Sequence, residues 1–375
     1  MPRPISATIS LSSLSHNLRI VAQQLTDGGV SAGRQRPSIW AVIKANAYGH
    51  GIENAISGFG QAEGLAMLDL DEAVRCREAG WTKPILLLEG FFEPADVETL
   101  VRHRLTTTVH CQEQLDMLSA SRVPEPIDAF IKLNTGMNRL GFSTNDYLAA
   151  YGQAQALQAR GILGTLGKMT HFARADDDAI VTQQQLRMFN QITQGLPGEV
   201  SLCNSAATLA PGLWASVPDR QDQWVRPGIC LYGSSPFAEK SAAEFGLLPA
   251  MTLAAKLISV RSISTGEAIG YGCTFVSSRS MRIGVVACGY ADGYPRHAVT
   301  GTPITVEGVC TRLLGRVSMD MLAVDLTPVP QARVGSSAVL WGDGGPSVDE
   351  VAAAAGTIGY ELLCAVAARI PKIIS

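Results

Sequence analysis

The chain has 375 residues, of which 46% are apolar and 17% charged, and its formal net charge at pH 7 is −3. This length exceeds what one hydrophobic core usually supports, so we expect two folded units. The basic residues form no stripe, which gives a nucleic-acid or membrane partner no electrostatic support and favours small molecules as partners.

We expect no targeting signal in the N-terminal part of the chain. Its opening, MPRPISATIS, lacks the charged start and apolar centre of a signal peptide, and no apolar run approaches the ~18 residues that span a bilayer. We therefore expect a cytoplasmic location. The stretch TDGGVSAGRQRP at 26–37 is predicted as a loop.

From residue 39 to about residue 232, eight short apolar runs alternate with segments of helical periodicity. The runs are IWAVIK, GLAML, ILLLEG, TTTVH, DAFIKLN, TLGKMTHF, VSLCNS and WVRPGICLYG. Between them, DLDEAVRCREAG at 69–80 and TQQQLRMFNQIT at 182–193 place apolar residues on one helical face. Eight strands that alternate with helices favour parallel pairing and close naturally into a (β/α)8 barrel, with a doubly wound open sheet as the alternative.

After "LYGSSPF" the pattern becomes rich in Val, Ile and Thr with glycine turns. The segments are MTLAAKLISVRSIS, MRIGVVACGY, TPITVEGVCTRLLGRVSMDMLAVDL and SSAVLWG, followed by a short helix, VDEVAAAAG, and a mixed segment, YELLCAVAARIP. We therefore predict an α/β chain with an N-terminal (β/α)8 TIM-like barrel over residues 1–240 and a predominantly β domain over residues 241–375.

The eight cysteines are widely spaced and include no C-x-x-C pair or histidines at metal-ligand intervals. This pattern is typical of thiols that fill apolar space in a reducing compartment, and we expect no metal.

Polar residues gather at the ends of the predicted strands, where a barrel carries its active site. They are Lys44, Lys132, Asn134, His171, Asn204 and Ser205, and Arg226 lies within the eighth run beside a Pro-Gly. A scatter unrelated to function would not place these residue types at the same end of so many strands.

Lys44 follows an apolar strand, so burial is expected to lower its pKa and make the amine a Schiff-base nucleophile. The alternative is a lysine that extends from the barrel rim into solvent. Ser205 and the N–H groups of Gly228 and Ile229 lie where such barrels bind phosphate. An imine-forming lysine that faces a phosphate pocket indicates pyridoxal 5'-phosphate (PLP) as cofactor.

Six ordered segments resemble the signatures of a known family. The segments AVIKANAYGHG, KLNTGMNRLGF, MTHFARADD, WVRPGICLYG, IGYGCTF and GRVSMDM are similar to those of alanine racemases, the bacterial PLP enzymes of the barrel-fold class (class III). The closing YELLCAVAARIP also fits, so the resemblance covers nearly the whole chain. It implies interconversion of L-alanine and D-alanine, which supplies D-alanine for peptidoglycan.

The resemblance also implies the roles of individual residues. Lys44 would bind PLP covalently and then serve as one base, and Tyr271 would be the opposing base, because a proton removed from one face of the substrate carbon must return to the other. Arg226 would meet the pyridine nitrogen, with His171 beside it. The implied phosphate contacts are Tyr48, Ser205, Gly228, Ile229 and Tyr360, with Asn204 at a position that the family does not hold fixed. For Tyr360, a core tyrosine is the alternative.

The substrate carboxylate would be met by Arg139 and by the main-chain N–H of Met319. By the same resemblance, Lys132 would be carbamylated, which makes it an anion able to orient Arg139. The alternative is an unmodified lysine paired with an acid or with chloride. Ser318 replaces a cysteine found in several relatives, and Lys168 is expected to face away from His171 without a role.

The resemblance further implies a head-to-tail homodimer, in which Tyr271 and Met319 of one subunit complete the pocket of the other. Other interpretations keep the PLP barrel but assign it serine, lysine or arginine as substrate, or a decarboxylation. A non-catalytic PLP carrier is a third interpretation, although such single-barrel relatives lack the second domain and a counterpart of Tyr271. The sequence does not decide between a biosynthetic and a catabolic isozyme.

Overall fold

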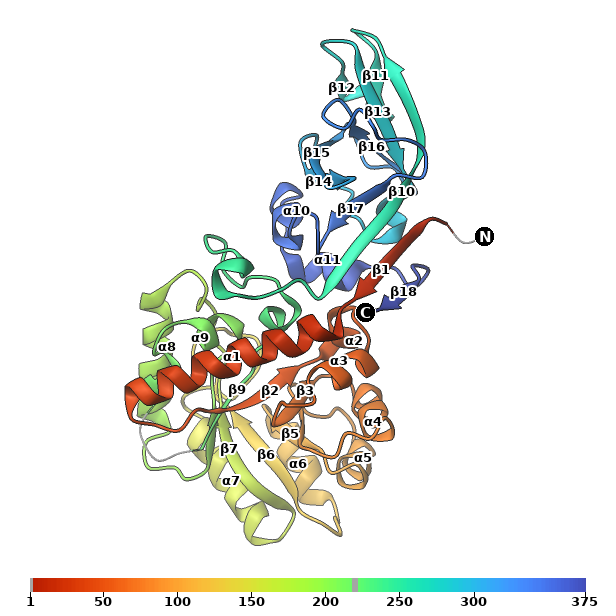
Figure 1. Ribbon diagram of the computed structural model, residues 1–375. Coiled ribbons are helices and arrows are strands. Elements are labelled where there is room, and N and C mark those ends of the chain that lie inside the picture. The colour runs from red at the N-terminus through yellow and green to blue at the C-terminus, as the bar shows by residue number, and fades with distance from the viewer. Residues whose placement is uncertain (1–2, 218–221) are drawn as a thin grey trace.

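Eight parallel strands close a barrel in the first part of the chain (Figure 1). The computed structural model describes residues 3–217 and 222–375. The barrel strands are β2 (Ser38–Val42), β3 (Gly64–Met67), β4 (Ile85–Leu87), β5 (Thr106–Val109), β6 (Ile127–Lys132), β7 (Leu163–Met169), β8 (Glu199–Ser201) and β9 (Gln223–Val225). They pair in chain order, and β9 pairs with β2 to close the ring. The predicted barrel is therefore confirmed, and the open sheet is excluded.

Helices connect the barrel strands and cover their outer faces (Figure 1). The predicted helical segments at 69–80 and 182–193 are confirmed as α4 (Leu70–Glu78) and α8 (Ala179–Ile192). Asp69 caps α4, because its carboxylate accepts the N–H groups of residues 71 and 72. The remaining helices of the barrel region are α1 (Leu11–Ala32), α2 (Lys44–Tyr48), α3 (Ile52–Gly58), α5 (Asp96–Arg102), α6 (Gln112–Ala120), α7 (Tyr147–Ala159) and α9 (Ser205–Leu209), with 3-10 turns η1 (Trp214–Ser216), η2 (Ile229–Tyr232) and η3 (Ala242–Phe245).

The prediction of a loop at 26–37 was wrong in its first half, because α1 continues to Ala32. The buried residues Leu18, Val21, Leu25 and Gly29 continue one face of the helix as far as the second glycine of the pair at 28 and 29. The helix ends at Gly33, which has a left-handed φ of 65° and donates to the last turn. Burial of this face outweighs the low helix propensity of the local sequence.

The second unit is built on a mostly antiparallel sheet, which confirms the predicted predominantly β domain (Figure 1). Its strand order is β13-β16-β15-β14-β17-β10-β1-β18, and β13 also pairs with β10. The strands are β1 (Ile5–Ile9), β10 (Met251–Ile263), β13 (Met281–Val286), β14 (Pro303–Val306), β15 (Val309–Leu314), β16 (Leu322–Asp325), β17 (Ser337–Trp341) and β18 (Lys372–Ile374). A small hairpin of β11 (Ala268–Ile269) and β12 (Phe275–Val276) encloses η4 (Tyr271–Cys273), and η5 (Tyr290–Asp292), α10 (Val348–Ala354) and α11 (Gly359–Ala365) complete the unit.

The N-terminal strand crosses from the barrel region into this second sheet. β1 pairs antiparallel with β10, from Ile5 opposite Ala255 to Ile9 opposite Met251, and parallel with β18. The two chain ends therefore lie side by side at the junction of the units (Figure 1). The division of the chain at residue 240 stays a prediction.

Within the described residues, no helix combines the length and the apolar character that crossing a membrane requires. All eight cysteines are free, and four of them are buried, namely Cys76, Cys203, Cys230 and Cys288. The described part of the chain contains no group of three or more His, Cys, Asp or Glu side chains arranged to hold a metal ion.

Candidate active site

A pocket of about 320 Å³ opens at the carboxyl ends of the barrel strands. It brings together ten of the residues predicted for the site, which are Lys44, Tyr48, Lys132, Arg139, His171, Asn204, Ser205, Arg226, Gly228 and Tyr360. Tyr360 comes from α11 of the second unit, so both units build the pocket. A larger groove of about 690 Å³ lies beside α8 and contains none of the predicted residues.

Lys44 and Tyr48 stand at the two ends of an unusual turn. Residues 45 to 48 all have left-handed backbone angles, with φ between 50° and 55°, although none of them is glycine. Such a conformation costs an L-residue about 1–2 kcal/mol, so the surroundings must hold it. The carboxylate of Glu72 accepts the N–H of Asn46 at 2.6 Å, and the Asn46 side chain accepts the N–H of Ile52 at 3.2 Å.

The amine of Lys44 is activated by its environment. Burial lowers its pKa, and the positive charge of Arg139 lowers it further, while Glu89 and Cys364 oppose this effect. A larger fraction of the amine is therefore unprotonated than in a solvent-exposed lysine, which is the state that a nucleophile or base requires.

Arg226 is buried at the centre of the pocket and is held by main-chain carbonyls. Its guanidinium donates to the carbonyl oxygens of Thr170 and Leu202 at 2.7 and 3.1 Å, and to the Ser201 hydroxyl at 2.6 Å. Burial lowers its pKa to about 10, which still leaves it protonated at neutral pH.

His171 lies against this cation, with its Nδ1 atom 3.3 Å from a guanidinium nitrogen of Arg226. Burial, followed by the charges of Arg226 and Arg139, holds the pKa of His171 well below its usual value. The imidazole is therefore neutral at neutral pH, and Nδ1 is the acceptor of the Arg226 donor.

Lys132 ends β6 and is 7% exposed. Burial and the charges of Arg226 and Arg139 lower its pKa to about 8. Arg139 follows a loop that Asn134 orders, because the Asn134 side-chain oxygen accepts the N–H groups of residues 136 and 138 at 3.0 Å. The strand end at Asn134 thus fixes the loop that carries Arg139.

Hydroxyl and main-chain donors gather at one side of the pocket. The N–H of Gly228 donates to the Ser205 hydroxyl at 2.8 Å. A Cβ atom at Gly228 would lie 2.5 Å from the Tyr48 hydroxyl oxygen, so only glycine permits this approach. The rings of Tyr48 and Tyr360 lie 6.1 Å apart. Asn204 lines the same side, but its side-chain oxygen caps α9 by accepting the N–H of residue 207.

Three predicted residues lie outside this lining. Ile229 follows Gly228 and is fully buried at the start of η2. Tyr271 and Met319 belong to the second unit and are 71% and 54% exposed. Tyr271 lies between β11 and β12, at the end of the second unit that is farthest from the barrel (Figure 1). The chain therefore does not bring Tyr271 to its own Lys44.

Sequence reasoning missed two acidic residues at the site. Glu89 lines the pocket and raises the pKa values of Lys44 and Lys132. It ends the run ILLLEG, so the strand-end rule that selected Lys44 would have found it. Glu72 lies in the first turn of an ordinary amphipathic helix, and its sequence context gives no sign of its contact with Asn46.

Lys168 does not line the pocket that contains His171, which agrees with the expectation that it faces away from His171. It is fully buried, and its amine donates to the carbonyl oxygens of Leu196 and Pro197 at 2.6 and 2.9 Å. Its role in these contacts is to hold the loop before β8.

The closed barrel, the β domain that follows it and the cation-lined pocket at the barrel mouth define a class of two-domain barrel enzymes. Two family models, "Alanine racemase, N-terminal domain" and "Alanine racemase, C-terminal domain", match residues 9–236 and 250–374. The chain is 63% identical to an alanine racemase of Bordetella avium and 53% identical to one of Ralstonia nicotianae. The first alignment covers 99% of both chains, and the second covers 100% of this chain and 96% of its relative.

Solved structures agree with these matches. The crystal structure of the biosynthetic alanine racemase from Pseudomonas aeruginosa has a TM-score of 0.90 and 43% identity, and the alignment covers 100% of this chain and 99% of that one. An alanine racemase from Bacillus anthracis with bound L-Ala-P has a TM-score of 0.79 and 28% identity, with 100% and 96% covered. The chain belongs to the alanine racemase family.

Proposed function

We propose that this chain is a PLP-dependent alanine racemase that interconverts L-alanine and D-alanine by proton transfer at Cα, and that it supplies D-alanine for peptidoglycan in the cytoplasm. Membership of the family supports the reaction. The observation that carries the site assignment is the single pocket in which Lys44, a guanidinium and a group of hydroxyl and N–H donors face one another.

The donor set fits PLP. The pocket is lined by four lysines and arginines but by only one acidic residue, Glu89. This excess of positive charge favours an anion that bears a phosphate group. The Tyr48, Ser205 and Tyr360 hydroxyls would hold the phosphate, together with the N–H groups of Gly228 and Ile229. Glycine at 228 leaves open the space beside Tyr48 that a Cβ atom would fill.

PLP, when bound, withdraws electrons from the substrate and acidifies its Cα–H. Lys44 would bind the cofactor covalently, because burial lowers the pKa of its amine. Arg226 would face the pyridine nitrogen. A guanidinium only donates hydrogen bonds, so Arg226 would leave that nitrogen unprotonated and moderate the electron withdrawal. With weaker electron withdrawal, return of the proton to the substrate would be favoured over side reactions.

Two bases on opposite faces are needed for racemisation, and we assign them to Lys44 and to Tyr271 of a second subunit. Tyr271 is exposed and distant from the pocket of its own chain, which supports assembly as a head-to-tail homodimer.

The substrate carboxylate would bind Arg139 and the N–H of Met319 from the partner. We further propose that Lys132 is carbamylated. A pKa of about 8 makes part of its amine available for reaction with CO2. The resulting carbamate would be attracted by the neighbouring cations, which repel the protonated lysine.

The test is to incubate the purified protein with PLP and L-alanine and to follow D-alanine with a D-amino-acid oxidase assay. Borohydride reduction and peptide mapping should place a pyridoxyl group on Lys44. Serine, lysine and arginine are assayed in parallel. A faster reaction with one of them would refute alanine as the substrate, and a label on another lysine would refute the site.

A further inference from the structure

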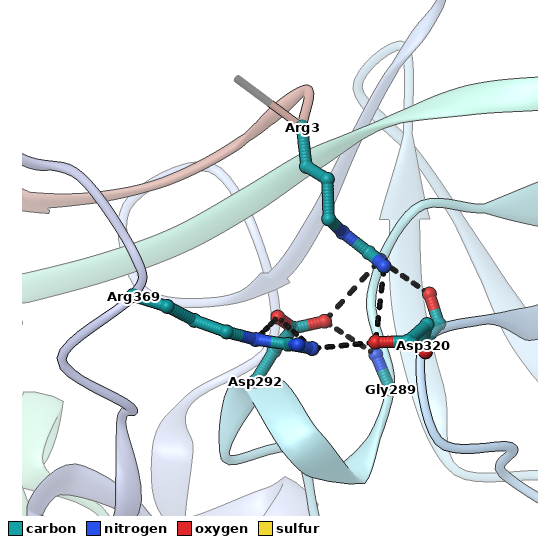
Figure 2. Close-up of polar contacts among 5 residues, drawn as sticks. All are labelled: Arg3, Gly289, Asp292, Asp320 and Arg369. Atoms are coloured by element: carbon teal, nitrogen blue, oxygen red, sulfur yellow. Dashed lines mark hydrogen bonds and ion pairs between the residues drawn. The ribbon is translucent and has the colours of Figure 1, made fainter.

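Four charged residues join both chain ends to two loops of the second unit (Figure 2). The Asp292 side chain is fully buried, and its Oδ1 accepts from Arg369 Nε at 2.8 Å. Arg369 also contacts Asp320, with Nη2 2.6 Å from Oδ1. Arg3 lies 3.4 Å from Asp292 and 3.1 Å from Asp320, so each arginine bridges the two acids.

The acids belong to neighbouring loops that are packed closely. Asp292 Oδ2 accepts the N–H of Gly289 at 3.0 Å and so closes its own loop (Figure 2). The N–H groups of Tyr290 and Ala291 donate to the carbonyl oxygens of Ser318 and Met319 at 3.1 and 2.9 Å. A Cβ atom at position 289 would lie 2.3 and 2.4 Å from those same carbonyl oxygens, so the approach depends on glycine.

Met319 therefore lies in a loop whose main-chain carbonyls are used for internal contacts. Its N–H, in contrast, donates to no acceptor among residues 3–217 and 222–375. Together with the 54% exposure of Met319, this leaves a fixed donor at the surface that is free to bind a ligand.

We propose that Arg3, Asp292, Arg369 and Asp320 form a positioning network that presents the N–H of Met319 to the carboxylate of the amino-acid substrate in the partner's pocket. This inference rests on the proposed function and adds four positioning residues to it. None of the four touches the reacting atoms in this assignment. Each acts through the loop of residues 317–321.

The anchoring of both arginines explains why the network can hold a loop in place. Arg3 precedes β1 and Arg369 precedes β18, and these strands pair in parallel, with Ala7 opposite Lys372. The two guanidinium groups therefore start from adjacent positions of one sheet. Removal of one arginine would leave the buried carboxylate between them only partly compensated. The cost in free energy is larger than that of breaking an exposed ion pair.

The test compares the holoenzyme with Arg369→Met and with a matched control, Arg312→Met. Arg312 also pairs with a nearly buried acid of the second unit, Asp325, at 3.2 Å, and it is similarly exposed. The readouts are kcat and KM for both alanine enantiomers, the cofactor absorbance spectrum, and the calorimetric Kd of propionate, a carboxylate that lacks the amine.

We expect Arg369→Met to raise KM and the propionate Kd together by about tenfold and to change kcat less than about twofold. The reason is that the N–H of Met319 would be misplaced, and this donor binds the carboxylate equally in the ground state and in the transition state. Arg312→Met should match the wild type. Arg369→Lys should recover part of the loss, since one ammonium group can reach one of the two acids.

Unchanged KM and propionate Kd in Arg369→Met, or a loss confined to kcat, would overturn the network. If Arg369→Met fails to fold, Arg3→Met at the exposed chain end carries the same test, with an expected rise of about threefold. A wild type that does not racemise alanine refutes the proposed function, whereas an active wild type with unaffected variants refutes only this inference.

Discussion

Removal of CO2 is expected to weaken the folded state through one side chain, Lys132. This lysine is buried beside Arg226, and its pKa is lowered to about 8, with burial as the main cause. The difference between 8 and the ordinary value of 10.5 corresponds to roughly 3 kcal/mol of penalty for the protonated amine. Carbamylation removes that penalty, because the cation becomes an anion among positively charged neighbours.

The pH dependence has a definite sign. In CO2-free buffer below pH 8, Lys132 is protonated in both folded and unfolded chains, so the penalty is fully present. Between pH 8 and 10.5 the folded protein releases the proton that the unfolded chain keeps, and the free energy of unfolding rises with pH. With bicarbonate present, folding converts the protonated lysine of the unfolded chain into a carbamate and releases a proton, so the free energy of unfolding rises with pH below pH 8 as well.

The assay is urea unfolding of the holoenzyme at neutral pH, with and without bicarbonate, and Lys132→Met is the control. We expect bicarbonate to raise the unfolding free energy of the wild type by roughly 3 kcal/mol and to leave the variant unchanged. Carbon-13 bicarbonate should give a carbamate signal in NMR spectra of the wild type only. Equal unfolding curves in both buffers, together with no carbamate signal, would refute the modification.

Three further experiments test other parts of the site. Glu72→Leu removes the acceptor of the Asn46 N–H, so it should lower the unfolding free energy by about 1–3 kcal/mol and weaken PLP binding. Glu72→Gln keeps an acceptor and should therefore keep most of the stability and most of the affinity for PLP. Tyr271→Phe chains mixed and refolded with Lys44→Ala chains should regain activity, because some mixed dimers contain one intact pocket. Ser205→Ala should weaken PLP binding about tenfold, measured by fluorescence titration, with activity restored by excess cofactor.

Each of these expectations has a control and an outcome that contradicts it. Glu53→Leu removes another first-turn glutamate, and a similar loss in this variant would show that the Glu72 effect is not specific. Failure of mixed chains to regain any activity would argue against shared pockets. Ser57→Ala on α3 should leave PLP binding unchanged, and an equal effect there would remove Ser205 from the phosphate site.

Local pattern alone was sufficient to predict the barrel. A strand buried on both faces reads as a short continuous apolar run, and a connecting helix shows a 3.6-residue period, so eight alternations can be counted without knowing any contact. The strand-end residues Lys44, Lys132, His171 and Arg226 then follow, because the carboxyl ends of parallel strands meet at one mouth. The resemblance to alanine racemases added Arg139 and Tyr360, which that rule does not select.

The left-handed turn after Lys44 was not predictable, because alanine, asparagine and tyrosine have no local preference for four successive positive φ angles. The contact with Glu72 that supports this turn comes from another helix. Likewise, the extension of α1 past residue 26 depends on a buried face that only packing creates.

The sequence by itself determined which segments become strands and helices and which residue types stand at the barrel mouth, since apolar character and its periodicity are properties of neighbouring residues. Only the tertiary structure decided that β1 joins the second sheet and that Arg3 and Arg369 meet two acids, one of which follows Met319 in the chain. Arg3 and Asp292 are 289 residues apart, and their contact follows from the pairing of the two chain ends in one sheet. No local pattern encodes a contact of that kind, because it forms only when distant strands are brought together.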